Sequence, residues 1–248
     1  MMMTITQLRK TWAITKKDIQ IYYLKGPVVI FGILFPLFLF FAFCIDRKLS
    51  PEFLIPGLIA MTIFFTSTSV SPVIAPWETQ MKTLERLVSC PLTVRTMILG
   101  DILASFLFGV IISIVPVIIG LAFGICIRAP VILSMAIVIG AFSFSSLGLL
   151  FSTIPTDLVS NVMMLSALVK FPLIFISGIF IPVDALPQWG VAIASLSPLT
   201  YFTDIARFSI SGHSYYPLYL DFILLVASAV IFLMLSMKFH ERALVSRL

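Results

Sequence analysis

The sequence contains six long windows that are almost free of charged residues. A helix needs about 20 apolar residues to cross the roughly 30 Å hydrocarbon core of a bilayer. Hydrophobic residues make up 60% of the chain and charged residues 11%, which is more apolar than a soluble domain. These features predict an all-α membrane protein with a single transmembrane domain over residues 1–248. We expect six spans, at residues 27–45, 53–75, 102–127, 130–152, 157–182 and 216–237.

Lysine and arginine residues are distributed unevenly among the connections between these windows. Eleven fall in the N-terminal segment, the second-to-third connection and the C-terminal tail, and four fall in the other connections. Because cytoplasmic loops retain basic residues, both termini are predicted to be cytoplasmic, in a multi-pass protein of the cell (plasma) membrane. No basic face with interleaved aromatic residues indicates nucleic-acid binding.

Residues 5–23 form an amphipathic segment ahead of the first window. At the helical period of about 100° per residue, its apolar and basic side chains occupy adjacent arcs. Such a helix is expected to lie along the bilayer surface, with its basic groups on lipid headgroups. The apolar arc contains Ile5, Leu8, Trp12, Ile19, Tyr22 and Tyr23.

A second short helix is predicted at residues 77–88, between the second and third windows. Glu78 and Lys82 are one turn apart in the favourable order, and Pro91 would end the helix. Its apolar side chains form one stripe, which needs a cover. That cover is either the cytoplasmic ends of this chain's own spans or a separate protein. The stripe contains Met81, Leu84, Leu87 and Val88.

Lys170 is the one charged residue deep inside a predicted span. A helix that begins near residue 156 places it about 20 Å along that helix, where exposure to lipid would cost at least about 2.5 kcal/mol. Lys170 is therefore expected to face protein, water or substrate. Three roles stay open: a place in the translocation path, a link to backbone carbonyls freed by Pro172, or snorkelling to the outer headgroups. Ser166 lies one turn earlier, but no flanking motif supports a Ser/Lys protease.

Proline and glycine interrupt the chain after the fifth window, yet residues 185–203 carry no charge. One interpretation is an outer loop with an interfacial helix, anchored by Trp189 and Tyr201. The other is a re-entrant helical segment at residues 183–207 that dips into the membrane from outside. Irregular backbone is tolerated at membrane depth where protein or water covers it, and the apolar composition favours the re-entrant form.

The chain shows no residues that could energise transport or catalyse a reaction. It lacks the phosphate-binding pattern G-x-x-x-x-G-K-[ST] and the zinc pattern H-E-x-x-H. Its three cysteines have no metal-ligand spacing and are expected to be packing residues. We therefore expect no catalytic residue, no metal and no cofactor on this chain.

Two segments carry motifs in a recognisable order. One is the run of residues 83–87, Thr-Leu-Glu-Arg-Leu, followed by Pro91. The other spans residues 171–207. Both are typical of the permease subunits of type 2 ATP-binding-cassette (ABC) exporters, so the chain resembles that family, closest to its drug-resistance and nodulation-type branch. The second motif contains Ser177, Gly178, Pro182, Pro187, Trp189, Pro198 and Tyr201.

The resemblance implies a role for each segment. The first is similar to the family's coupling segment, which contacts a separate nucleotide-binding subunit, and Cys90 stands where the family often has Thr. The second is similar to the family's elements that cap the exit path. By the same resemblance, residues 5–23 would border the ATPase contact as a connector helix. The coupling positions implied here are Leu84, Glu85, Arg86, Leu87 and Pro91.

In function, the resemblance implies the permease of an ATP-driven exporter that works by alternating access. Its partners would be an ABC ATPase that carries ATP and Mg, a second permease copy or homologue forming a dimer, and membrane lipids. A hydrophobic drug, a lipid or a lipo-oligosaccharide is the implied substrate class. Two alternatives stay open at this point: a membrane assembly or scaffold protein without transport, and an ion-coupled carrier.

Overall fold

The computed structural model describes residues 5–44, 50–90, 92–154, 156 and 158–247. Within these ranges the chain is helical and contains no β-strand. The α-helices are α1 (Ile5–Asp18), α2 (Gly26–Cys44), α3 (Pro51–Ser69), α4 (Ile74–Gln80), α5 (Thr83–Ser89), α6 (Val94–Ala122), α7 (Pro130–Phe151), α8 (Val159–Ile176), α9 (Gln188–Ala194), α10 (Pro198–Ser211) and α11 (Leu218–Arg247). The shorter helical turns are η1 (Ile19–Tyr23, π-helical), η2 (Ser71–Val73) and η3 (Val183–Ala185), the last two 3-10.

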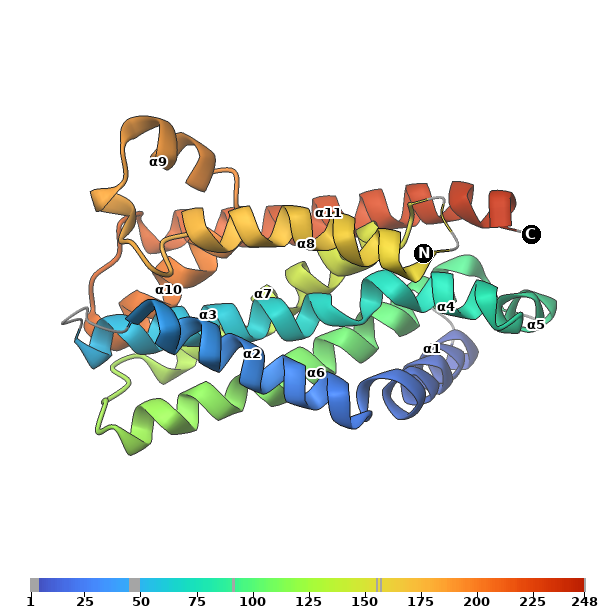
Figure 1. Cartoon of the computed structure of the whole chain (residues 1–248), viewed down its shortest axis with the longest axis horizontal. Coiled ribbons are helices and arrows are strands. Elements are labelled where there is room, and N and C mark those ends of the chain that lie inside the picture. Colours follow the sequence, from blue (N-terminus) through green and yellow to red (C-terminus); the bar gives the residue numbers. More distant parts are fainter. Residues whose placement is uncertain (1–4, 45–49, 91, 155, 157, 248) are drawn as a thin grey trace.

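The long helices run along the longest axis of the molecule (Figure 1), with α1 and α5 at one end and α9 and α10 at the other. Within the described part of the chain, five helical segments are long and apolar enough to cross a membrane. The prediction of an all-helical membrane protein is therefore confirmed. These segments are Pro51–Gln80, Val94–Ala122, Pro130–Phe151, Val159–Ile176 and Leu218–Glu241.

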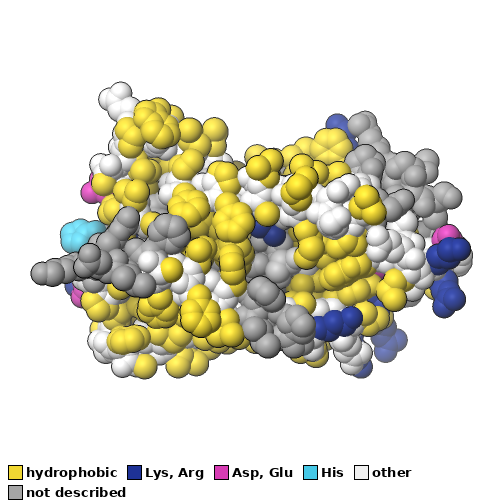
Figure 2. All heavy atoms as spheres, viewed as in Figure 1, with side chains coloured by type: hydrophobic (Ala, Val, Ile, Leu, Met, Phe, Trp, Pro, Cys, Tyr) yellow, Lys and Arg dark blue, Asp and Glu magenta, His cyan; other side chains and the backbone are white. Residues whose placement is uncertain are grey.

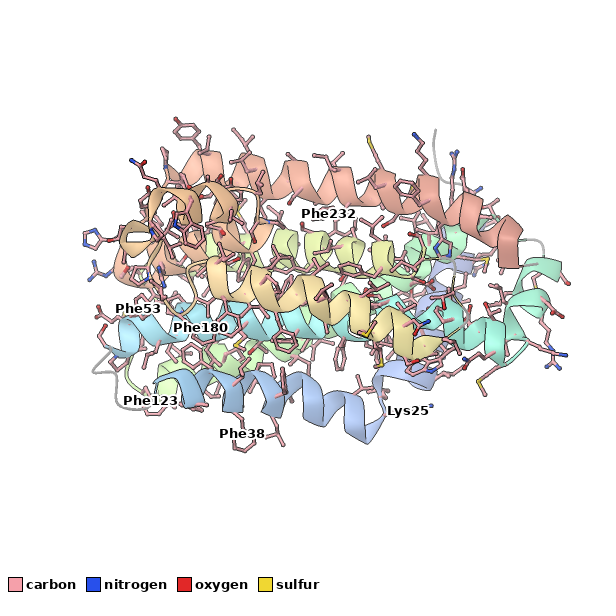
Figure 3. The ribbon with its side chains drawn as sticks, turned by 45° about the horizontal axis from the view of Figure 1, so that its top comes forward. Lys25, Phe38, Phe53, Phe123, Phe180 and Phe232 are labelled. Carbon is pink, nitrogen blue, oxygen red and sulfur yellow. The ribbon has the colours of Figure 1, made fainter. Side chains whose placement is uncertain are left out.

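The first predicted span coincides with α2, which is not among these five segments. Figure 3 shows that Phe38 of α2 points away from the bundle. Lys25 directly precedes the first residue of this helix. Residues 45–49, which follow α2, lie outside the described residues. The count of six spans stays a prediction.

Helix α3 lies at the centre of the bundle, packed against α2, α6, α7 and α10. Its Phe64 meets Phe144 of α7 edge to face, with ring centroids 5.2 Å apart, and Phe144 meets Phe202 of α10 at 5.8 Å. All three rings are fully buried. Edge-to-face packing of this kind adds to the free energy gained by burial, so these rings join α3, α7 and α10 in one core.

Small residues allow the backbones of α3, α6 and α7 to approach closely. A Cβ atom added to Gly148 of α7 would lie 2.2 Å from Ser71 Oγ and 3.2 Å from Thr68 Cα. One added to Gly109 of α6 would lie 2.0 Å from Ser67 Oγ. Small residues at helix crossings are typical of membrane bundles, where packing rather than the hydrophobic effect holds helices together.

Several buried hydroxyl groups in these helices are paired with oxygen atoms nearby, whereas those of Ser67 and Ser145 have no partner among the described residues. Thr68 Oγ1 donates to the Phe64 carbonyl at 2.6 Å, and the Ser143 and Ser228 hydroxyls, on α7 and α11, lie 3.0 Å apart. Such pairing lets polar side chains lie inside an apolar bundle without an unsatisfied group.

The connection between the second and third windows differs from the prediction. The single helix expected at residues 77–88 is instead two short helices, α4 and α5, separated by Lys82 in a left-handed conformation with φ of 53°. A non-glycine residue adopts this conformation at a cost, and the sequence has no glycine there to indicate it. The Glu78–Lys82 pair is also absent, because Glu78 bonds to Lys17.

We expect Gly148→Val to destabilise the protein by about 1–3 kcal/mol or more, because the added atoms meet the backbone of α3, which cannot move aside cheaply. Thermal unfolding of the detergent-solubilised protein measures the effect. Gly190→Ala is the matched control, since its added Cβ would have its nearest neighbour at an ordinary 3.4 Å. Equal melting temperatures for Gly148→Val and wild type would contradict the close approach.

Candidate functional site

At the end of the bundle that carries α1 and α5, helix α1 packs directly on α6. Thr15 Oγ1 donates to the Gly100 carbonyl at 3.1 Å, and a Cβ atom on Gly100 would lie 2.6 Å from Ile14. Leu8 and Trp12, on the predicted apolar arc, stay exposed. One face of α1 is thus covered by the chain's own bundle. The predicted apolar arc is open at Leu8 and Trp12, but its Tyr22 and Tyr23, in η1, are buried in the bundle.

A buried group of charges joins α1, α4 and α6. Lys17 Nζ lies 2.9 Å from Asp18 Oδ1 and 2.5 Å from Glu78 Oε1. The carboxyl groups of Asp18 and Asp101, the latter on α6, lie near enough to interact electrostatically. These three carboxyl groups are buried, and Lys17 is half-buried. One ammonium group therefore faces three carboxyl groups at the place where the three helices meet.

The charges in this group alter each other's protonation. Burial lowers the pKa of Lys17, but the carboxylates of Asp18, Glu78 and Asp101 outweigh burial and hold that pKa above its ordinary value. Burial raises the pKa of Asp18 in spite of Lys17 beside it. Lys17 is therefore fixed as a cation, and it is the group that makes the buried carboxylates tolerable.

The predicted coupling residues on α5 differ in their exposure to solvent. Leu84 is 2% exposed and packs with Ile14 and Met97 of this chain, and Leu87 lies at the edge of the same cluster. Glu85 and Arg86 are exposed. The chain itself therefore covers Leu84 and part of Leu87, whereas Met81 of the same predicted stripe is exposed and the Val88 side chain lies outside the described part of the chain. Pro91 lies outside the described residues.

A cavity of about 400 Å³ opens between η1 and the α4–α5 connection. Arg86, Met81 and Cys90 line one side, and Lys17, Tyr22 and Glu78 line the other. The Tyr22 ring stacks on Trp77 of α4 with centroids 5.6 Å apart. Arg86 of α5 thus lines the same cavity as Lys17 and Glu78 of the buried charge group.

In the middle of the bundle, Lys170 of α8 is 9% exposed. Its Nζ atom donates to the Thr68 carbonyl at 2.5 Å. Pro72 has no N–H group to bond to this carbonyl four residues earlier, so Lys170 supplies the missing donor. A link to a freed carbonyl was one of the three predicted roles, but the proline that frees the carbonyl is Pro72 of η2 and not Pro172 of α8.

At the opposite end, the chain after α8 turns back toward α10. The Ser177 and Ser197 hydroxyls lie 2.8 Å apart, and Gly178 has a φ of 78° that favours glycine. The Arg207 guanidinium donates to the Gly178 carbonyl and lies 4.2 Å above the Phe53 ring. Figure 3 shows Phe53 and Phe180 together at this end. The turn at Ser177–Gly178 is therefore held to both α3 and α10.

The prolines of the second motif lie at helix starts. Pro182 precedes η3, Pro187 precedes α9 and Pro198 is the first residue of α10. Trp189 on α9 is 68% exposed, whereas Tyr201 on α10 is buried and its hydroxyl donates to the Ser195 carbonyl. Helix α10 is buried along nearly its whole length, and α9 projects from the bundle (Figure 1). Re-entry of this segment into the membrane stays a prediction.

Sequence reasoning missed Asp204. Its carboxylate accepts hydrogen bonds from the backbone N–H groups of Tyr215, at 2.9 Å, and Tyr216, at 2.8 Å. These bonds fix the connection between α10 and α11. No local pattern signals an acceptor eleven residues before its donors, so the contact depends on the three-dimensional fold.

The sequence pattern of the ABC-2 type transporter family matches residues 9–211 of this chain. The chain belongs to that family. The match runs from α1 to the end of α10 and includes both segments on which the resemblance rests. The resemblance is thereby confirmed at the level of the family, whereas the drug-resistance and nodulation-type branch stays a prediction.

Similar proteins include members named as transport permeases. A Cyanophora paradoxa protein named as a transport permease, ycf38, is 30% identical over 175 residues, which cover 66% of this chain and 57% of ycf38. The inner membrane transport permease YadH of Escherichia coli strain K12 is 24% identical over 195 residues, which cover 77% of this chain and 75% of YadH. The chain thus spans a little over half the length of ycf38. Family membership and the five apolar helices make it a multi-pass membrane protein.

Removing the central cation of the buried charge group should destabilise this ABC-2 family member. We expect Lys17→Met to cost about 3–5 kcal/mol, because it leaves buried carboxylates without a counter-charge. Lys16→Met, on the exposed side of the same helix, is the matched control. Thermal unfolding in detergent measures both variants.

The Lys17→Met defect should also depend on pH. The folded-state pKa of Asp18 lies above its ordinary value, so the folded protein takes up a proton more readily than the unfolded chain. The destabilisation should therefore shrink as pH falls from alkaline to mildly acidic, where protonation removes the uncompensated charge. A defect that stays constant over this range would argue against the charge group.

Proposed function

We propose that this chain is the permease subunit of an ATP-driven ABC exporter that works by alternating access. The observation that carries the proposal is the family match over residues 9–211. The relatives ycf38 and YadH, both named as transport permeases, support the same function. A scaffold without transport would not need a permease-type bundle, and an ion-coupled carrier would not need a coupling segment.

ATP hydrolysis is assigned to a separate nucleotide-binding subunit. The sequence has no phosphate-binding G-x-x-x-x-G-K-[ST] pattern, so ATP and Mg would be bound by that partner. A second permease copy or a homologue would complete the membrane dimer. On this chain, no residue is assigned a catalytic role.

The end that carries α1 and α5 is proposed to face the cytoplasm. Figure 2 shows most Lys and Arg side chains of the visible face gathered toward this end, next to a broad hydrophobic surface. That distribution fits the positive-inside rule. With α2 as a sixth span, both termini would lie in the cytoplasm, and α9 and α10 would form the outer, exit side.

The ATPase is proposed to dock on the exposed part of the α4–α5 connection. Glu85, Arg86 and the 70% exposed Met81 are free to meet a partner. Leu84 and Leu87 would transmit the movement of α5, since they pack α5 against α1 and α6. Movement of the partner would therefore reach two other helices through α5.

For the substrate, we propose a hydrophobic drug, a lipid or a lipo-oligosaccharide. The drug-resistance and nodulation-type branch, which the sequence is predicted to resemble, supports this class by analogy. Lys170 is the candidate residue of the translocation path, because its side chain lines a cavity of about 590 Å³ between the spans.

Coupling can be tested by a double charge reversal, Glu85→Arg with Arg86→Glu. The permease should still insert and fold, because both side chains are exposed, but substrate-stimulated ATP hydrolysis by its partner should fall about tenfold, as expected when a docked charge pair is inverted. The reconstituted complex is assayed for phosphate release.

The matched control for this experiment is the reversal of Arg95 and Glu241, an exposed pair 3.3 Å apart elsewhere on the same end. This control should keep its stimulated hydrolysis. Full stimulation in a folded Glu85/Arg86 reversal would refute docking on α5.

Topology can be tested with the native cysteines. Cys90, next to α5, and Cys126, between α6 and α7, are both exposed. In a Cys44→Ser background with one remaining cysteine at a time, Cys126 should react with a membrane-impermeant maleimide on intact cells. Cys90 should react after the membrane is permeabilised. The reverse pattern would invert the proposed orientation.

A further inference from the structure

A cavity of about 590 Å³ lies among α2, α3, α4 and α8. Its wall is almost entirely apolar, with aromatic rings from three helices, and Lys170 is the one ionisable side chain that lines it. Figure 2 shows a hollow in the hydrophobic face of the molecule with dark blue basic atoms recessed in it. Its apolar lining includes Val28, Phe35, Phe65, Val70, Val73 and Trp77.

Among the described residues, no carboxylate forms an ion pair with the ammonium group of Lys170. The ion pairs of the described residues are formed by Lys17 and Arg95, and none involves Lys170. Its one hydrogen bond goes to the Thr68 carbonyl, while an ammonium group can donate three. A buried cation without a counter-charge is costly, so an anion beside it would be stabilised.

A second buried donor lies on the same side of α8. Ser166 is one turn before Lys170, so both side chains fall on one helix face. Ser166 is 2% exposed, and its hydroxyl has no hydrogen-bond partner among the described residues. Both residues line a smaller hollow of about 140 Å³ that shares Phe65, Ser69 and Val73 with the larger cavity. An unpaired hydroxyl and a partly free ammonium therefore converge on one space.

We propose that this cavity and the smaller hollow beside it together bind an amphipathic anion, with its acidic headgroup on Lys170 Nζ and Ser166 Oγ and its apolar chain along the aromatic wall of the larger cavity. A carboxylate or phosphate can accept from both donors at once. A cationic ligand would be repelled by Lys170, and a neutral apolar one would leave the Ser166 hydroxyl and the remaining N–H groups of Lys170 unpaired. This inference rests on the proposed function in that the bound anion would be the exported substrate, and it narrows the substrate to acidic amphiphiles.

The site can be tested by a pair of probes that differ only in charge: a fluorescent long-chain fatty acid and its methyl ester. Binding is measured by fluorescence anisotropy on the purified full-length protein in nanodiscs of zwitterionic lipid. Wild type should bind the acid about tenfold more tightly than the ester, equivalent to about 1.4 kcal/mol. Lys170→Arg should keep a preference for the acid, and Lys170→Met should abolish it.

Controls separate the headgroup site from general effects. Lys238→Met removes an exposed lysine on α11 and should leave the preference unchanged, which excludes an effect of net charge. Ser166→Ala should reduce the preference about threefold, which lies at the lower end of the range for the net contribution of one hydrogen bond. Lys170→Met leaves the Thr68 carbonyl without a donor, so the same substitution is also made with Pro72→Ala, which restores an N–H group there.

The outcomes are distinct. Equal binding of acid and ester to wild type, or an acid preference that persists in folded Lys170→Met, would overturn the anion site. If anionic phospholipid in the nanodisc displaces the acid through Lys170, the occupant is a bilayer lipid and not a free amphiphile. Acid binding without any stimulation of an ATPase partner would leave the site intact and refute the proposed exporter.

Discussion

A carbonyl group inside a membrane span must find its donor within the protein, because hydrocarbon offers none. In the central helical segment, Pro72 deprives the Thr68 carbonyl of such a donor, and Lys170 supplies it from a helix far along the chain. Helix α8 has few other inward-facing contacts, since its buried side chains are the narrow set Val162, Ser166, Lys170 and Ile174. This one bond therefore ties α8 to the break after α3, and the walls of the main cavity are built on either side of it.

The close approach of α3 to α6 and α7 serves the same requirement. Where Gly109 and Gly148 face serine residues, the helices come near enough for hydroxyl groups to lie beside neighbouring backbone. The buried charge group works differently, since it joins α1, α4 and α6 through Lys17 and not through small residues. Three kinds of polar contact thus hold this apolar bundle together. They are the bond from Lys170 to a backbone carbonyl, the serine hydroxyls at the close helix crossings, and the charge group around Lys17.

Much of this fold could be predicted from the sequence, because a span is a local property of about 20 residues. Apolar windows and amphipathic periodicity predict the helices α1, α6, α7, α8 and α11. Helix α6, however, begins at Val94, where Thr93 caps it, and not at residue 102, where the predicted span begins after Asp101. The site was less predictable. Exposure separates Glu85 from Leu84, and Lys17 pairs with Glu78 across 61 positions. Such contacts depend on which helix faces overlap, and periodicity in one segment does not contain that information.

The bend between α4 and α5 has a mechanical meaning. The local sequence favours one straight helix over residues 77–88, yet Lys82 is held in a left-handed conformation that costs roughly 1–2 kcal/mol. What opposes the straight form is tertiary: Leu84 against Ile14 and Met97, and the Thr83 hydroxyl on the Glu78 carbonyl at 3.2 Å. In this segment, the local sequence therefore favours a straight helix, whereas the packing of Leu84 favours the bend at Lys82. Any event that loosens Leu84 shifts the balance toward the straight helix and swings α5 about Lys82.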